Sequence, residues 1–218
     1  MSRAVRIPAY ILRHRENAAI YGFQVKHGTY PAPFLARVFY LSFDRLRINN
    51  PELLSKGYFV TILILIRHGQ TDYNSAKRYC GLSDPPLNHK GIEQAKRLAV
   101  RLKGISIGKV YSSALARAYD TAVLIFRNKA IKKSVDLREM DFGIFEGLTH
   151  QEIIKKRPKL YKSWIDNPLE VKIPGGEKPT QFRRRVRRYF SSILSRHPDE
   201  TIAVVTHGGP IRVILCDA

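Results

Sequence analysis

Val60-Thr-Ile-Leu-Ile-Leu-Ile66 is a nearly continuous run of β-prone residues, and the polar sequence Arg67-His68-Gly69 follows it directly. A strand with one face in water shows an alternating pattern, whereas an unbroken apolar run of this length is typical of a strand that is buried on both faces. Such strands occur in parallel sheets that carry helices on both sides. The run therefore predicts a central parallel strand that ends where the polar residues begin.

Strand-like and helix-like patterns alternate downstream of this run. Ser113 is placed to cap a helix, and Thr149-His-Gln-Glu152 fits a capping box that opens a short helix ending before Pro158. The predicted elements are, in order, a helix at 89–103, a strand at 108–111, a helix after Ser113, a weaker strand at 133–137, a short helix after Thr149, a helix at 180–193, a strand at 202–206 and a helix at 211–216. This order predicts an α/β fold, a three-layer sandwich with a mostly parallel central sheet covered by helices on both faces.

The first 58 residues differ in character from the rest of the chain. They are basic, rich in Tyr, Phe and Arg, interrupted by prolines, and without clear helical or alternating periodicity. We interpret 1–58 as an N-terminal extension of unknown role. It could be a targeting or nucleic-acid-binding arm, a poorly ordered segment, or upstream sequence included by a misplaced start. Residues 59–218 then form the folded domain.

The composition favours a cytoplasmic protein that binds anions. Lys and Arg number 38 against 18 Asp and Glu, which gives a net charge of +20 and makes polyanions or small phosphates natural partners. Only two cysteines occur, Cys80 and Cys216, so neither a disulfide scaffold nor a Cys-x-x-Cys site is expected. The longest apolar run, 62–66, is too short to span a bilayer, and no signal peptide is recognisable. We therefore expect no membrane partner.

The arginine-rich sequence Phe182-Arg-Arg-Arg-Val-Arg-Arg-Tyr-Phe190 raises an alternative of another class, a basic nucleic-acid-binding protein. At helical spacing its apolar residues form a stripe that the core requires. Its arginines are then expected mostly to face outward; they are Arg183, Arg184, Arg185, Arg187 and Arg188. Since no nucleic-acid-binding motif is recognisable, we expect association with nucleic acid to be only non-specific.

Polar residues gather where the predicted strands end. In a doubly wound sheet, ligands bind beyond the carboxyl ends of the strands, so these residues should meet in one crevice. They are Arg67-His68-Gly69, Ser112-Ser113 with Arg117, Arg138-Glu139, and His207-Gly208-Gly209. The set combines cations and imidazoles with a single nearby carboxylate, which suits a phosphoryl group and not a divalent metal. We therefore predict a phosphate site with no metal ion and no other cofactor.

Several spaced segments carry a resemblance to a known family. They are Arg67-His68-Gly69-Gln70-Thr71-Asp72-Tyr73-Asn74, Tyr79-Cys-Gly-Leu-Ser-Asp-Pro-Pro-Leu-Asn88, Ser112-Ser-Ala-Leu-Ala-Arg-Ala-Tyr-Asp-Thr-Ala122, Leu137-Arg-Glu-Met-Asp-Phe-Gly-Ile-Phe-Glu-Gly147, Pro174-Gly-Gly-Glu177 and Thr206-His-Gly-Gly-Pro-Ile-Arg212. Together they resemble the phosphoglycerate mutase-like histidine phosphatase superfamily from about Val60 to the C-terminus. Two of these blocks, Arg138-Glu-Met-Asp-Phe-Gly143 and Gly81-Leu-Ser-Asp-Pro-Pro-Leu87, look most like the α-ribazole phosphatase and broad-specificity phosphatase branch.

The resemblance implies a role for each matching residue. His68 would be the nucleophile that forms a phosphohistidine, and Glu139 the proton donor, although Asp141 and Glu146 are nearby carboxylates that the sequence leaves open. Arg67, Arg117 and His207 would stabilise the transferring phosphoryl group. Further hydrogen bonds to the phosphate are expected from Asn74, Gly81 and Gly208, where glycine lets the backbone approach closely.

The predicted function is that of a metal-independent phosphomonoesterase acting on a small phosphate ester. The branch implies α-ribazole 5′-phosphate, used in cobalamin nucleotide-loop assembly, as a candidate substrate. A phosphoglycerate mutase is the alternative within the family, and dependence on a bisphosphate primer would reveal it. The family domain normally continues beyond the second His-Gly segment, so we expect 59–218 to be a C-terminally truncated domain.

Overall fold

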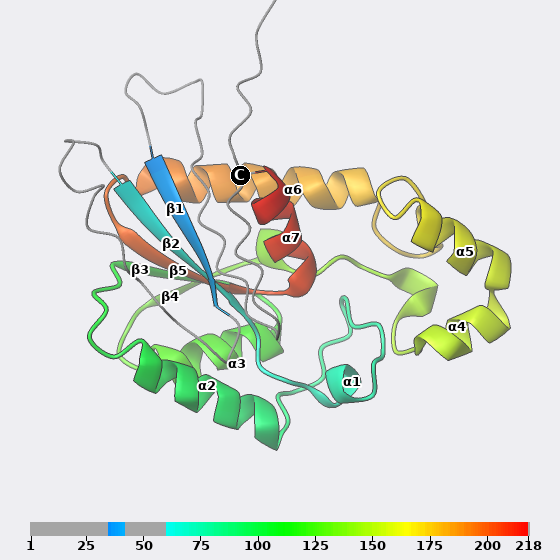
Figure 1. Ribbon diagram of the computed structural model, residues 1–218, viewed down its shortest axis with the longest axis horizontal. Helices are drawn as coiled ribbons and strands as arrows, with labels where there is room; N and C mark the ends of the chain where they lie inside the picture. The colour runs from blue at the N-terminus through cyan, green and yellow to red at the C-terminus, as the bar shows by residue number, and fades with distance from the viewer. Residues whose placement is uncertain (1–34, 42–59, 218) are drawn as a thin grey trace, which may run out of the picture.

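The computed structural model describes residues 35–41 and 60–217 (Figure 1). The predicted extension at 1–58 lies outside the described residues except for 35–41. Among the described residues, no helix is long and apolar enough to cross a membrane.

A five-stranded sheet in the order β1-β2-β5-β3-β4 forms the centre of the fold, and all of its pairings are parallel. Its strands are β1 (Leu35–Leu41), β2 (Val60–Arg67), β3 (Lys109–Ser113), β4 (Ile131–Ser134) and β5 (Thr201–Thr206). The predicted central strand is confirmed as β2, which lies between β1 and β5. Strand β1 falls in the segment where the sequence showed no clear pattern, because one short run with Arg37 in the middle carries no distinct alternation.

Helices cover both faces of the sheet, as the fold prediction required (Figure 1). Ile64 and Ile66 of β2 pack in a cluster with residues of α2 (His89–Arg101) and α3 (Ala116–Ile125). Leu63 and Leu65 point the opposite way, into a cluster with residues of α6 (Pro179–Arg196) and α7 (Gly208–Asp217). Because successive side chains of a strand alternate between faces, the unbroken apolar run of β2 supplies both cores. The three-layer α/β architecture is confirmed.

The short elements agree with the sequence in part. Thr149 and Glu152 form the predicted capping box at the start of α4 (His150–Lys156). Pro158 then opens a further helix, α5 (Pro158–Asp166), which the sequence analysis did not predict; proline is favoured at the first position of a helix because its missing N–H is not needed there. The remaining helical turns are α1 (Asp72–Ser75), η2 (Val135–Leu137) and η3 (Gly143–Phe145).

Several boundaries differ from the prediction, and three of them show a physical reason. Ser113 belongs to β3 and does not cap α3; the first N–H groups of α3, on Ala116 and Arg117, donate to Asp84, which is remote in sequence. The predicted strand at 133–137 ends at Ser134, whose Oγ accepts from the Asp136 N–H and starts the η2 turn. The last helix begins at Gly208 and so includes residues that the sequence assigned to the preceding loop.

Candidate active site

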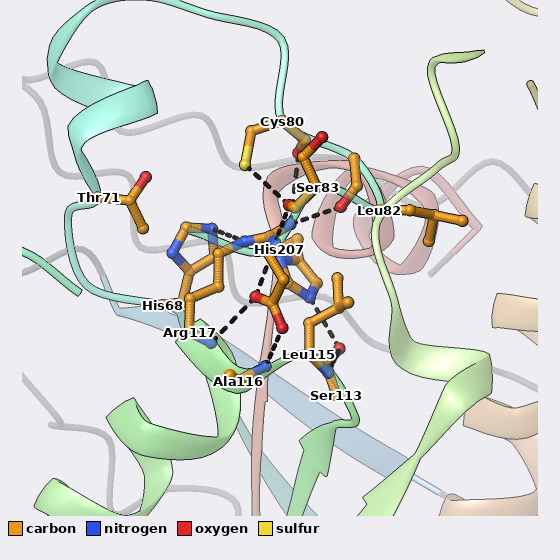
Figure 2. A network of polar contacts seen from close by, with 12 residues as sticks. His68, Thr71, Cys80, Leu82, Ser83, Ser113, Leu115, Ala116, Arg117 and His207 are labelled. Carbon is orange, nitrogen blue, oxygen red and sulfur yellow. Dashed lines mark hydrogen bonds and ion pairs between the residues drawn. The ribbon is translucent and has the colours of Figure 1, made fainter. Parts of the chain in front are cut away.

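Two imidazoles face each other at the carboxyl ends of neighbouring parallel strands. His68 follows β2 and His207 follows β5, and the pairing of Arg67 with Thr206 brings the two strand ends level. The ring centroids lie 5.0 Å apart, and both side chains are buried (Figure 2). The two histidines therefore meet at the carboxyl ends of the strands, where the sequence predicted that they would.

His68 is held in one tautomer. Its Nδ1 lies 2.7 Å from the Gly69 carbonyl oxygen, and because a carbonyl can only accept, Nδ1 carries the hydrogen and Nε2 keeps its lone pair. Burial, followed by the charge of Arg117, lowers the pKa of His68 to about 3. The imidazole is therefore neutral over the physiological pH range, and its Nε2 carries no proton.

A close backbone approach fixes the position of His68. The Gly69 N–H donates to Thr121 Oγ1 at 3.0 Å, which joins the turn after β2 to α3. A Cβ added to Gly69 would come within 2.5 Å of the Gly91 carbonyl oxygen in α2. Only glycine allows the two backbones to come this close.

Arg117 occupies the floor of the crevice with its side chain wholly buried. Its Nε donates to His68 Nε2 at 3.3 Å (Figure 2). Its Nη1 donates to the Ser83 carbonyl oxygen at 2.7 Å and to Asp84 Oδ1 at 3.1 Å. Its Nη2 donates to the Gly81 carbonyl oxygen at 2.8 Å. The guanidinium is thus aimed at His68 by the loop at 80–84.

Glu146 also holds the loop at 80–84, through hydrogen bonds to its backbone N–H groups. Its carboxylate accepts N–H groups from Gly81, Leu82 and Ser83 at 3.0 to 3.1 Å. Two corrections follow for the sequence predictions. Glu146 is a loop anchor and not a candidate acid, and Gly81 gives its N–H to Glu146, so that its carbonyl orients Arg117 while its N–H is not offered to a phosphate.

One ring nitrogen of His207 is without a hydrogen-bond partner among the described residues. Its Nε2 lies 2.8 Å from Ser113 Oγ, whereas Nδ1 is buried and has no hydrogen-bond partner among the described residues. Burial, the nearby His68 ring and the charge of Arg117 hold the pKa of His207 well below its usual value. Because a buried polar atom without a partner is costly, Nδ1 is a natural contact for a polar ligand.

Glu139 is the carboxylate beside the imidazole pair. Its two oxygens accept N–H groups from Met140 and Gly209, both at 2.9 Å. Burial raises the pKa of Glu139 against the opposing effect of these hydrogen bonds and of Arg117 and Arg67. A Cβ added to Gly209 would lie 2.0 Å from Glu139 Oε1, so only glycine leaves room for the carboxylate.

The remaining predicted residues have different surroundings. Asp141 accepts from the Gly143 N–H at 2.8 Å and so belongs to a turn. Arg67 is exposed and lies beside Gly208, the first residue of α7. Asn74 uses its amide oxygen to accept from the Thr71 N–H and hydroxyl, both at 3.1 Å, which leaves only its amide nitrogen for a phosphate.

Sequence reasoning missed the contacts that hold the site in shape, although it placed Ser113 among the residues that meet there. Asp84 lies 33 positions from Arg117, and Ser113 lies 94 positions from His207, so no local pattern announces either pair. Arg185 was expected to face outward, but its guanidinium points inward and bonds to Glu139 and its neighbours. In the described part of the chain, no group of three or more His, Cys, Asp or Glu is arranged to hold a metal ion.

Comparisons with known proteins agree with this geometry. Residues 63–218 match the family model of the Histidine phosphatase superfamily (branch 1). The chain is similar to Phosphoserine phosphatase 1 of Hydrogenobacter thermophilus, with 35% identity over 156 residues that cover 71% of this chain and 74% of the relative. It is 37% identical over 160 residues to the Metal-independent phosphoserine phosphatase of Arabidopsis thaliana, covering 71% of this chain and 67% of that protein.

A solved structure shows the same similarity. The α-ribazole phosphatase of Shigella flexneri superposes with a TM-score of 0.66 and 31% identity, covering 71% of this chain and 77% of that chain. Some relatives are much longer, since the chain spans 43% of the length of mycobacterial proteins that are 40% identical to it.

Proposed function

Because the chain belongs to the histidine phosphatase superfamily and is a phosphatase, we propose that it hydrolyses small phosphate monoesters through a phosphohistidine on His68, without a metal ion. One observation carries the proposal: Arg117 Nε donates to the unprotonated Nε2 of His68, and the ring of His207, whose Nδ1 is buried without a hydrogen-bond partner among the described residues, lies 5.0 Å from that of His68.

In the first step, His68 Nε2 attacks phosphorus as the ester P–O bond breaks. The Nδ1–H bond to the Gly69 carbonyl stabilises the positive charge that develops on the ring. Arg117 Nε transfers its hydrogen bond from His68 to a phosphoryl oxygen, and Arg67 and His207 contact the others. Glu139, whose pKa is raised by burial, is the acid that we assign to give a proton to the leaving oxygen.

In the second step, water attacks the phosphohistidine. Glu139, now a carboxylate, takes a proton from the water as the new P–O bond forms and the P–N bond breaks. The electron pair returns to Nε2, inorganic phosphate leaves, and neutral His68 and protonated Glu139 are restored. Both steps use groups that the structure already holds in one crevice.

The leaving alcohol is a separate question. The relatives include proteins named phosphoserine phosphatase and α-ribazole phosphatase, so phosphoserine and α-ribazole 5′-phosphate are the two candidates we propose. Phosphoglycerate mutase activity is the alternative on the same site, since a phosphohistidine can pass its group to a second hydroxyl in place of water.

A substrate panel tests the proposal. Phosphate release is measured with a chelator present from phosphoserine, α-ribazole 5′-phosphate, 3-phosphoglycerate and p-nitrophenyl phosphate. Chelator-resistant turnover supports the proposed reaction, and the preferred ester identifies the alcohol. Interconversion of phosphoglycerates that needs a bisphosphate primer would favour the mutase. Folded protein that releases no phosphate from any of the four would contradict the proposal.

The pH dependence should reveal Glu139. We expect kcat/KM for alkyl esters to fall as the pH rises through the raised pKa of Glu139, because the ionised carboxylate cannot protonate the leaving group. No acid limb is expected near pH 6.5, since the pKa of His68 is lowered to about 3. Glu139→Gln should lower the rate by about 10²- to 10⁴-fold and lose the alkaline limb. The pH dependence of kcat/KM is measured for this variant and for Asp141→Asn, the matched control. If Glu139→Gln kept the decrease of kcat/KM at high pH, the acid would be another residue.

A further inference from the structure

Arg185 and Glu177 form a two-point ion pair close to the candidate acid. Arg185 Nε donates to Glu177 Oε1 at 2.7 Å, and Nη2 donates to Glu177 Oε2 at 2.8 Å. The two side chains are only 16% and 18% exposed. A pair with this parallel geometry fixes the plane of the guanidinium as well as its position.

The rest of the guanidinium holds the backbone that carries Glu139. Nη1 donates to the carbonyl oxygens of Asp136 and Arg138 at 2.8 and 2.9 Å, and Nη2 donates to the Glu139 carbonyl at 2.9 Å. With the two bonds to Glu177, all five N–H donors of the side chain are used. These three carbonyls belong to the η2 turn and the segment after it, where no strand supplies partners.

Glu139 is therefore fixed from two sides. Arg185 of α6 holds its main chain, and the N–H groups of Met140 and Gly209 hold its carboxylate. The loop that supplies Glu177 is tied to the same region, since the Glu177 N–H donates to the Asp141 carbonyl oxygen at 3.0 Å. A shift of even 1 Å in a proton donor is costly, because general acid catalysis requires hydrogen-bond distance to the leaving oxygen.

We propose that the Arg185–Glu177 pair is a positioning device for Glu139, one that places the proton donor against the leaving oxygen. This inference rests on the proposed function. Arg185 acts through the backbone of Glu139 and does not touch the substrate, and Glu177 neutralises the charge of Arg185 and sets its direction. The pair therefore affects proton donation more than it affects phosphate binding.

Leaving-group dependence separates positioning from a purely structural role. An alkyl oxygen needs a proton as the P–O bond breaks, whereas the p-nitrophenolate group leaves without one. A misplaced Glu139 should therefore slow the formation of the phosphohistidine, which kcat/KM reports, from alkyl esters and spare it for p-nitrophenyl phosphate. The later hydrolysis of the phosphohistidine uses Glu139 as a base and is common to both esters. General loss of folded enzyme lowers both rates by the same factor.

The test compares Arg185→Met and Glu177→Gln with Arg184→Met, a neighbouring exposed arginine of the same helix. Rates are measured on p-nitrophenyl phosphate and on the alkyl ester that turns over fastest in the panel, below the melting temperature of every variant. We expect kcat/KM on the alkyl ester to fall by at least about tenfold more than kcat/KM on the aryl ester in Arg185→Met. The control should match the wild type.

Arg185→Lys keeps the charge but cannot reach three carbonyls and a carboxylate together, so it provides a milder variant if Arg185→Met does not fold. It should show the same selective loss on the alkyl ester. Equal losses on both esters, or no loss in a folded variant, would overturn the inference and leave the proposed function standing. A wild type that hydrolyses neither ester would overturn both.

Discussion

His68→Gln should reduce phosphate release from every ester of the panel by at least about a thousandfold, since removal of a nucleophile abolishes the covalent route. The loss should not depend on the leaving group, because both alkyl and aryl esters need the attack of Nε2. Glutamine is neutral, as the buried imidazole is, so the fold should survive the change. Steady-state phosphate assays on the purified variant, with its thermal melt recorded, give the result.

His89→Gln is the matched control for this variant. His89 is exposed at the start of α2, and the substitution should leave turnover unchanged. A folded His68→Gln protein that kept even a tenth of the wild-type rate would show that His68 is not the nucleophile.

Arg117→Met should damage both activity and stability. Loss of the guanidinium removes a donor from the phosphoryl group, and we expect kcat/KM to fall by about 10²-fold or more. It also leaves Asp84 without its ion-pair partner, the carbonyls of Cys80 and Gly81 without their arginine donor, and the Ser83 carbonyl with only the Cys80 thiol. Because the loss of this wholly buried side chain strands several acceptors, the free energy of unfolding should fall by about 3 kcal/mol.

Urea unfolding and substrate kinetics check these two effects separately. Arg97→Met is the control, because Arg97 is exposed on α2 and reaches Glu93 only at 3.8 Å. Its free energy of unfolding should change by less than about 1 kcal/mol. Arg117→Lys should restore little, since an ammonium group cannot supply the fork of donors that Arg117 uses. A stable, active Arg117→Met protein would contradict the account of the crevice floor.

The centre of the fold and the meeting of polar residues at the strand ends could be predicted from the sequence for a physical reason. A strand buried on both faces must be apolar along its whole length, so β2 was visible as Val60–Ile66 without any other information. Parallel strands end at one edge of the sheet, so the polar residues after β2 and β5 had to meet there. His68 and His207 do meet, with ring centroids 5.0 Å apart.

Contacts between distant parts of the chain could not be predicted in the same way. The sequence of α6 does not reveal whether a given arginine faces water. Arg185 instead donates hydrogen bonds to the carbonyl oxygens of the η2 turn and the residues after it. The sequence suggests that the Gly81 N–H could bind a phosphate. In the structure this N–H donates to the Glu146 carboxylate, which lies 65 positions away. Strand β1 likewise depends on pairing with the open edge of β2 and not on a strong pattern of its own. In each case the decisive partner lies far away in sequence.

The central claim is a phosphoryl group bonded to Nε2 of His68, and trapping it in a single turnover tests that claim most directly. The wild type is mixed with p-nitrophenyl phosphate and a chelator, quenched in alkali, where a phosphohistidine survives, and mapped by mass spectrometry. A good leaving group makes the first step fast, so the intermediate should accumulate as nitrophenolate appears in a burst. We expect the phosphoryl group on His68 and none in His68→Gln. Phosphate on another residue, or turnover with neither burst nor labelled protein, would contradict the account.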